Sequence, residues 1–218
     1  MNIILGGTHG LGAEIAQLVK DPFVIGRSYD EKLHGTGMRA DLADLRDVAA
    51  IVDFITANQL TGFYWVAGYG YMGDFSDQKD VLHMATVNFA HVLPIAQAAW
   101  SVLQSAADGV FAVVSSTTGI KARANEAIYA ATKHAQVGFT RSLGLEAERL
   151  GISTRVSLFL PGGMQTPFWP EDNKPSSFGD FLNPRKVARE IVQDSTNQTT
   201  PYFERMIDRG SYSDYVYS

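Results

Sequence analysis

The chain has 218 residues, of which 45% are hydrophobic and 19% charged, with a formal net charge of −5. This composition is sufficient for one domain with its own core, and the acidic balance lacks the basic face that nucleic-acid binding requires. The absence of cysteine excludes disulfides, thiolate catalysis and cysteine metal sites, and it fits the reducing cytoplasm in which we expect the protein to act. No apolar run reaches membrane-spanning length and the first residues do not resemble a signal peptide, so we expect no membrane partner.

Strand and helix patterns alternate along the chain. Buried strands are expected at residues 2–5, 23–25, 38–40, 62–67, 109–115, 154–160 and 200–207. Helices are expected at residues 11–19, 44–57, 78–103 and 127–150, with a last helix that opens at Asn183-Pro184 and a polar loop at 28–37. Gly151 is placed to end the fourth of these helices. The alternation predicts an α/β fold: a Rossmann-like, doubly wound parallel sheet with helices on both faces, in a single domain over residues 1–218.

A glycine-rich turn follows the first expected strand and opens the first helix. Gly6, Gly10 and Gly12 have the spacing G-x-x-x-G-x-G. Glycines here allow the backbone to approach a pyrophosphate, and a helix N-terminus offers free N–H groups to it. The turn therefore indicates dinucleotide binding, with a plain strand-to-helix turn as the alternative.

Three polar residues form a second motif. Tyr129 and Lys133 are four residues apart and share a helix face, and Ser116 ends the strand at 109–115. A lysine ammonium about 4–5 Å away should hold the pKa of the phenol well below its usual value of about 10. Tyr129 would then exchange a proton with a substrate oxygen, to which Ser116 donates a hydrogen bond. The alternatives are a chance Y-x-x-x-K helix and a serine that caps the strand end.

Together these motifs resemble the short-chain dehydrogenase/reductase family, of which the chain is identified as a compact member with a shortened second crossover and C-terminus. The resemblance implies that Ser116, Tyr129 and Lys133 are catalytic, with Asn88 as a fourth member; in relatives that asparagine holds a water that links the lysine to solvent. A polar helix residue is the alternative for Asn88. The cofactor-binding residues that we expect from the resemblance and from local chemistry are Gly6, Thr8, His9, Gly10, Leu11, Gly12, Arg27, Ser28, Asp41, Leu42, Ala67, Gly68, Asn88, Tyr129, Lys133, Pro161, Gly162, Met164 and Thr166.

Residues after the second expected strand favour NADP(H) over NAD(H). NAD enzymes usually carry an acid here for the ribose 2′-hydroxyl, whereas this chain has Gly26 followed by Arg27. A guanidinium suits a 2′-phosphate, with Ser28 and His9 as further donors. A solvated surface arginine is the alternative for Arg27. Asp41 resembles the family's adenine contact, and it is equally placed to cap a helix.

Two departures from the family pattern stand out. Trp65-Val66 replaces the usual Asn-Asn pair ahead of Ala67-Gly68, so the asparagine that braces the sheet is missing. The connection from Arg27 to Met38 is too short for a full crossover helix, and we expect that helix to be reduced or lost.

Residues 167–183 form a substrate flap by their resemblance to the family. The flap contains Phe168, Trp169, Phe178 and Phe181, which favours an apolar or ring-bearing carbonyl compound, unless these rings pack on the core instead. Lys174 is the flap's positive charge, which makes a strongly anionic substrate less suited to it.

The function that follows is an oxidoreductase that transfers a hydride between NADP(H) and a carbonyl or secondary alcohol, with Tyr129 as general acid/base. The partners expected are a small-molecule substrate and copies of the same chain in a homodimer or homotetramer, packed through the helices around Asn88 and Tyr129. No metal is expected, because the histidines show no ligand spacing. The alternative is a non-catalytic NADP(H)-binding regulator or scaffold of the same fold.

Overall fold

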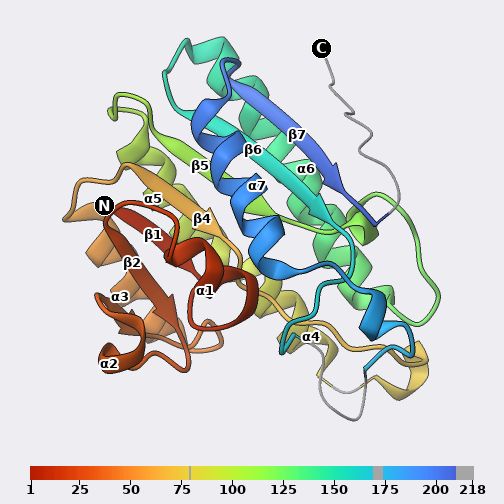
Figure 1. Ribbon diagram of the computed structural model, residues 1–218. Helices are drawn as coiled ribbons and strands as arrows, with labels where there is room; N and C mark the ends of the chain where they lie inside the picture. The colour runs from red at the N-terminus through yellow and green to blue at the C-terminus, as the bar shows by residue number, and fades with distance from the viewer. Residues whose placement is uncertain (79, 169–173, 210–218) are drawn as a thin grey trace.

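The chain folds around one twisted parallel sheet. The computed structural model describes residues 1–78, 80–168 and 174–209, and these contain seven strands in the order β3-β2-β1-β4-β5-β6-β7 (Figure 1). Every pairing in the sheet is parallel. The strands are β1 (Asn2–Leu5), β2 (Pro22–Gly26), β3 (Gly37–Arg39), β4 (Gly62–Trp65), β5 (Val110–Val114), β6 (Arg155–Pro161) and β7 (Tyr202–Ile207).

Helices cover both faces of this sheet, which confirms the predicted doubly wound Rossmann-like fold. On one face α1 (Gly10–Ala16) packs beside α7 (Pro184–Asn197), which crosses in front of the sheet in Figure 1. On the other face lie α3 (Leu45–Thr56), α5 (Val92–Leu103) and α6 (Ala127–Leu150).

Strand residues divide between the two faces because successive side chains of a strand point in opposite directions. In β4, Phe63 and Trp65 join the core under α3, α5 and α6, whereas Tyr64 joins the core under α1 and α7. All three are at most 1% exposed. Burial of each such side chain contributes about 1.5–3 kcal/mol, so the central strands are fixed in register and their carboxyl ends form a rigid edge.

The long helix α6 has the predicted bounds. It ends at Gly151, whose φ of +62° is the left-handed conformation that a glycine C-cap adopts. Helix α7 begins as predicted with Pro184 at its first position, and the side chain of Asn183 accepts from the N–H groups of Arg185 and Lys186. The predicted seventh strand is also present, as β7.

The single helix predicted over residues 78–103 is wrong. The segment contains a short helix, α4 (Val81–Ala85), a π-helical turn, η2 (Thr86–Ala90), and then α5. Asp80, at a φ of +55°, prevents an earlier start to α4, and the wider π turn shifts the register before α5 begins. Pro94 lies in the first turn of α5, where its missing N–H needs no partner.

The second crossover is reduced, as expected, although residues 28–37 are not wholly a loop. They contain a four-residue helix, α2 (Glu31–His34), whose first turn is capped by the side chain of Asp30. Gly35 then turns the chain into β3 with a φ of +69°. Among the residues described, no helix is long and apolar enough to cross a membrane.

Candidate functional site

A cleft of about 880 Å³ runs along the carboxyl ends of the strands. It crosses the boundary between β1 and β4, where the strand order reverses, which is the usual ligand position in open α/β sheets. Its walls include the residues that follow each of the seven strands, β1 to β7. The predicted site residues on these walls are Gly6, Thr8, His9, Gly10, Leu11, Gly12, Arg27, Ser28, Asp41, Leu42, Ala67, Gly68, Ser116, Tyr129, Lys133, Pro161, Gly162, Met164, Thr166, Phe168 and Phe181.

The glycine turn at one end of the cleft admits no larger residues. A Cβ on Gly6, at a φ of +88°, would lie 2.6 Å from the backbone of Ala67, and one on Gly12 would overlap the carbonyl oxygen of Gly6. Gly10, at a φ of +53°, faces Thr166 from the turn after β6. His9 precedes α1 and makes no side-chain bond to its first turn. The turn thus presents bare backbone to the cleft, which fits a dinucleotide pyrophosphate.

Two arginines stand at the far side of the glycine turn. Arg27 follows β2 and lines the cleft. Arg39, at the end of β3, donates from Nε to the carbonyl oxygen of Arg27 at 3.1 Å. The ends of β2 and β3 therefore carry two exposed cationic side chains beside the cleft and no carboxylate at Gly26.

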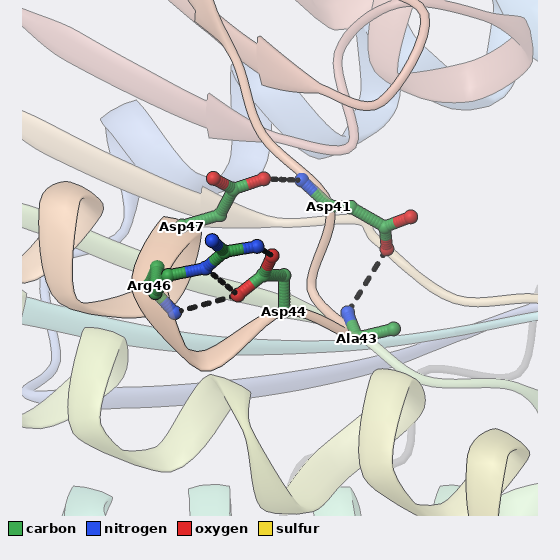
Figure 2. Close-up of polar contacts among 5 residues, drawn as sticks. All are labelled: Asp41, Ala43, Asp44, Arg46 and Asp47. Atoms are coloured by element: carbon green, nitrogen blue, oxygen red, sulfur yellow. Dashed lines mark hydrogen bonds and ion pairs between the residues drawn. The ribbon is translucent and has the colours of Figure 1, made fainter.

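Asp41 and Asp44 have different roles, as Figure 2 shows. Asp44 is the N-cap of α3: its Oδ1 accepts from the N–H of Arg46 at 2.9 Å, and its carboxylate also binds the Arg46 guanidinium. Asp41 accepts from the N–H of Ala43 at 2.9 Å and donates its own N–H to Asp47 Oδ2 at 2.8 Å. The helix-cap alternative for Asp41 is therefore wrong, and Asp41 remains on the cleft wall beside Leu42.

Ser116, Tyr129 and Lys133 meet on one wall of the cleft, and all three are buried. The Nζ of Lys133 lies 5.7 Å from the centre of the Tyr129 ring, so the two side chains leave α6 on the same face. Ser116 Oγ accepts from the N–H of Thr118 at 3.1 Å, which caps the 3-10 turn Thr117–Gly119. Its side chain also hydrogen-bonds the phenol of Tyr129. The serine is thus both a strand-end cap and a neighbour of the tyrosine.

Burial dominates the proton affinities of this pair. It raises the pKa of Tyr129 above the ordinary value of 10.0, against the opposing hydrogen bond from Ser116. It lowers the pKa of Lys133 from 10.5 to about 7. The predicted lowering of the phenol's pKa by the lysine is therefore wrong for this structure. Both groups lose water on burial, so both favour their neutral forms.

Asn88 lies behind the cleft wall and is fully buried in the π turn. Its Oδ1 accepts from the N–H of Tyr69 at 2.9 Å, and its Nδ2 donates to the Tyr69 carbonyl at 2.8 Å and to Thr132 Oγ1 at 3.2 Å. It thereby fixes the segment that carries Gly68, where a Cβ would lie 3.2 Å from Asn88 Oδ1 and 3.8 Å from Lys133 Nζ. In this structure the direct contacts of Asn88 are with protein groups and it supports the wall.

Phe168 and Phe181 of the flap line the cleft, whereas Phe178 does not. Phe168 packs edge-on against Tyr129 at 5.6 Å between ring centres, and Gly70 leaves room for it, since a Cβ there would lie 2.8 Å from the Phe168 ring. Phe181 lines the cleft beside Gly163. Phe178 packs on Phe181 at 5.6 Å and is not among the cleft-lining residues. Trp169 lies outside the described residues.

Several residues that line the cleft were not predicted from the sequence. Arg123 donates to Thr117 Oγ1 at 3.3 Å, and Glu126 accepts from Thr118 Oγ1 at 3.2 Å. Burial raises the pKa of Glu126. Their position in the sequence could have indicated them, because both lie in the loop that connects Ser116 to Tyr129 and this loop must run beside the site. Tyr69, His83, Asp208 and Arg209 are further examples.

Comparison with known proteins agrees with this geometry. A family model described as short chain dehydrogenase matches residues 1–176. The chain belongs to the short-chain dehydrogenase family. Levodione reductase from Leifsonia aquatica is 28% identical over 160 residues, which cover 70% of this chain and 58% of that protein.

Solved structures share the whole fold of this short-chain dehydrogenase. One is a short chain dehydrogenase from Burkholderia cenocepacia in complex with NADP, with a TM-score of 0.82, 21% identity and 96% of each chain covered. Another is 3-ketoacyl-(acyl-carrier-protein) reductase from Brucella melitensis complexed with NADH, with a TM-score of 0.82, 20% identity and 96% of each chain covered. The family is one of oxidoreductases, and its structural neighbours bind NADP or NADH. Within the described part of this chain, no group of three or more His, Cys, Asp or Glu could hold a metal ion.

The lowered pKa of Lys133 predicts how its replacement by methionine affects stability. Below pH 7 the folded protein holds a buried ammonium, whereas the unfolded chain keeps its lysine protonated up to about pH 10.4. The folded form therefore binds fewer protons between these values, and wild-type stability gains from rising pH there. Lys133→Met removes the burial cost, so it should stabilise the protein more at pH 6 than at pH 9.

Chemical unfolding at the two pH values measures this difference, with Lys186→Met on the exposed side of α7 as the control. An equal effect of Lys133→Met at both pH values would contradict the lowered pKa.

Proposed function

We propose that this short-chain dehydrogenase transfers a hydride between NADP(H) and a carbonyl compound or secondary alcohol, with Tyr129 as the general acid/base. The observation that carries the proposal is the shared wall of Ser116, Tyr129 and Lys133, in a cleft whose other end is a glycine turn with no room for side chains. A bound nicotinamide would supply or accept the hydride.

Tyr129 and Ser116 would act on the substrate oxygen. In the reductive direction the oxygen gains negative charge as the carbon gains a hydride, and it then takes a proton from Tyr129. Burial raises the pKa of the phenol, so Tyr129 carries that proton at pH 7. Ser116 Oγ accepts from Thr118 and hydrogen-bonds the phenol, and with a substrate in place its proton would be donated to the same substrate oxygen. The protonated phenol makes reduction the direction that these residues support.

Arg27 would select NADP(H). Its guanidinium lies at the end of β2, with Arg39 beside it, and a planar guanidinium can bind a 2′-phosphate through two hydrogen bonds. Asp41 and Leu42 on the neighbouring wall would contact the adenine.

The substrate would be a small apolar or ring-bearing carbonyl compound. Phe168, which packs on Tyr129, and Phe181 give the substrate end of the cleft an apolar surface, and Arg123 and Glu126 add polar groups beside it. We also propose a homodimer or homotetramer through α5 and α6, because Gly138 on the exposed side of α6 has open space above it.

Loss of the Tyr129 hydroxyl should abolish most turnover. The wild type should oxidise NADPH with members of a panel of ketones, aldehydes and quinones. Tyr129→Phe should lower kcat/KM by about 10²- to 10⁴-fold, the usual contribution of a general acid. The change at the exposed Tyr71, Tyr71→Phe, is the matched control and should leave kcat/KM within about twofold of the wild type. Tight NADPH binding by the wild type without turnover on the panel would favour the non-catalytic alternative.

Removal of the Arg27 guanidinium should weaken the binding of NADPH but not that of NADH. Arg27→Ala should raise the Kd for NADPH about tenfold or more, which is the loss of a charge-assisted hydrogen bond, and leave the Kd for NADH nearly unchanged. Isothermal titration measures both constants. Arg46→Ala is the control, because the Arg46 side chain is bound to Asp44. Wild-type protein that binds NADH as tightly as NADPH would overturn the preference.

A further inference from the structure

Lys133 makes a polar contact with Gln136, one turn further along α6. Gln136 is fully buried. Its Oε1 accepts from Lys133 Nζ at 3.0 Å, and its Nε2 donates to the backbone carbonyl of Asn88 at 3.0 Å. The second acceptor for Lys133 Nζ is the carbonyl oxygen of Val114, at 3.1 Å. Gln136 therefore links the lysine to the π turn that supports the cleft wall.

An amide is suited to this position. A charged lysine side chain has donors and no acceptor, and the Asn88 carbonyl has only acceptors. A group that links the two therefore needs one acceptor for the lysine and one donor for the carbonyl. Glutamine supplies both from one neutral group. A carboxylate could not donate to Asn88, and an aliphatic side chain would leave both partners unsatisfied in a buried site.

The geometry points to Gln136 as a positioning residue for the proposed reaction, one that fixes Lys133 beneath Tyr129 through a neutral acceptor and ties it to Asn88. This inference rests on the proposed function of the Tyr129–Lys133 pair. It also means that the contact between Lys133 and the Asn88 carbonyl passes through an amide, which carries no titratable proton. Lys133 would thus be fixed in position by this link and would not pass protons through it to Asn88.

Lys133 Nζ donates to one backbone carbonyl and one side chain, so a substitution at Gln136 is the direct way to change its hydrogen-bond partners. The neighbours from β5 and from the segment after β4 are the Val114 carbonyl and Gly68, which are neutral. The π turn is linked to Lys133 through Gln136 by the Asn88 carbonyl, which is also neutral. The titratable neighbour on α6 is Tyr129, whose charge is suppressed by burial. Among the described residues, burial is the cause that lowers the pKa of Lys133 to about 7.

The test compares the pH dependence of NADPH-driven carbonyl reduction in the wild type, Gln136→Glu and Gln136→Met. A carboxylate beside Lys133 keeps the lysine protonated to higher pH, so the alkaline limb of kcat/KM should move up by about one pH unit or more in Gln136→Glu. Methionine provides no acceptor, so the limb should move down in Gln136→Met. Gln193→Glu, on the exposed side of α7, adds the same charge away from the site and should leave the profile unchanged.

A second readout needs no turnover. The rise in unfolding free energy between pH 7 and pH 10 should be smaller in Gln136→Glu than in the wild type, because the paired lysine no longer loses its proton on folding. If both variants lose stability equally at every pH and their rate profiles coincide with the wild type, Gln136 only fills space and the inference is overturned. A wild type without turnover would overturn the proposed function, and the unfolding measurements would still decide the role of Gln136.

Discussion

Removal of water from Tyr129 and Lys133 is the interaction on which the rest of the site depends. Considered as an isolated pair, a cationic amine one helical turn from a phenol makes the phenol a stronger acid. In the folded chain both groups are buried, and the loss of hydration outweighs their attraction: the pKa of the phenol rises and the pKa of the amine falls to about 7. The protein therefore holds a protonated tyrosine beside an amine that is close to losing its charge.

Neutral hydrogen-bond partners set the state of that amine. Lys133 has the Val114 carbonyl and the Gln136 amide, and neither is an anion. A carboxylate in either place would keep the lysine charged at any physiological pH and would bring a negative charge near the phenol. Neutral acceptors fix the side chain in position while leaving its charge sensitive to whatever lies in the cleft. A ligand that adds charge or excludes water there would change both pKa values at once, which in the proposed reaction would couple occupation of the cleft to proton transfer.

The sequence was sufficient for the features that depend on local patterns. The bounds of α6, the Asn183 cap of α7 and the order of strands and helices follow from periodicity, capping residues and glycine positions, and these agree with the structure. The π turn at Thr86–Ala90 was not predictable in this way. It depends on Asn88, whose contacts are with Tyr69, Thr132 and Gln136, residues distant in sequence. The edge-on packing of Phe168 against Tyr129 is likewise a tertiary contact.

The error in the predicted direction of the Tyr129 pKa has the same origin. Spacing in the sequence gives the distance between two charges on a helix, but it does not give the dielectric around them. That quantity depends on the segments that cover the pair, which include Phe168 of the flap, packed on the phenol, and the end of β5 at Val114. For the same reason Arg123 and Glu126 were missed: their proximity to the site depends on the path of the loop before α6.

The most direct measurement is an NMR titration of the side-chain nitrogen of Lys133, with ¹⁵N-labelled lysine and Lys133→Met to assign the signal. The account predicts that this nitrogen loses its proton with a pKa near 7, while the exposed lysines titrate near their ordinary value of about 10.4. A Lys133 signal that stays charged to pH 10 would show that burial does not control the pair, and would contradict the account.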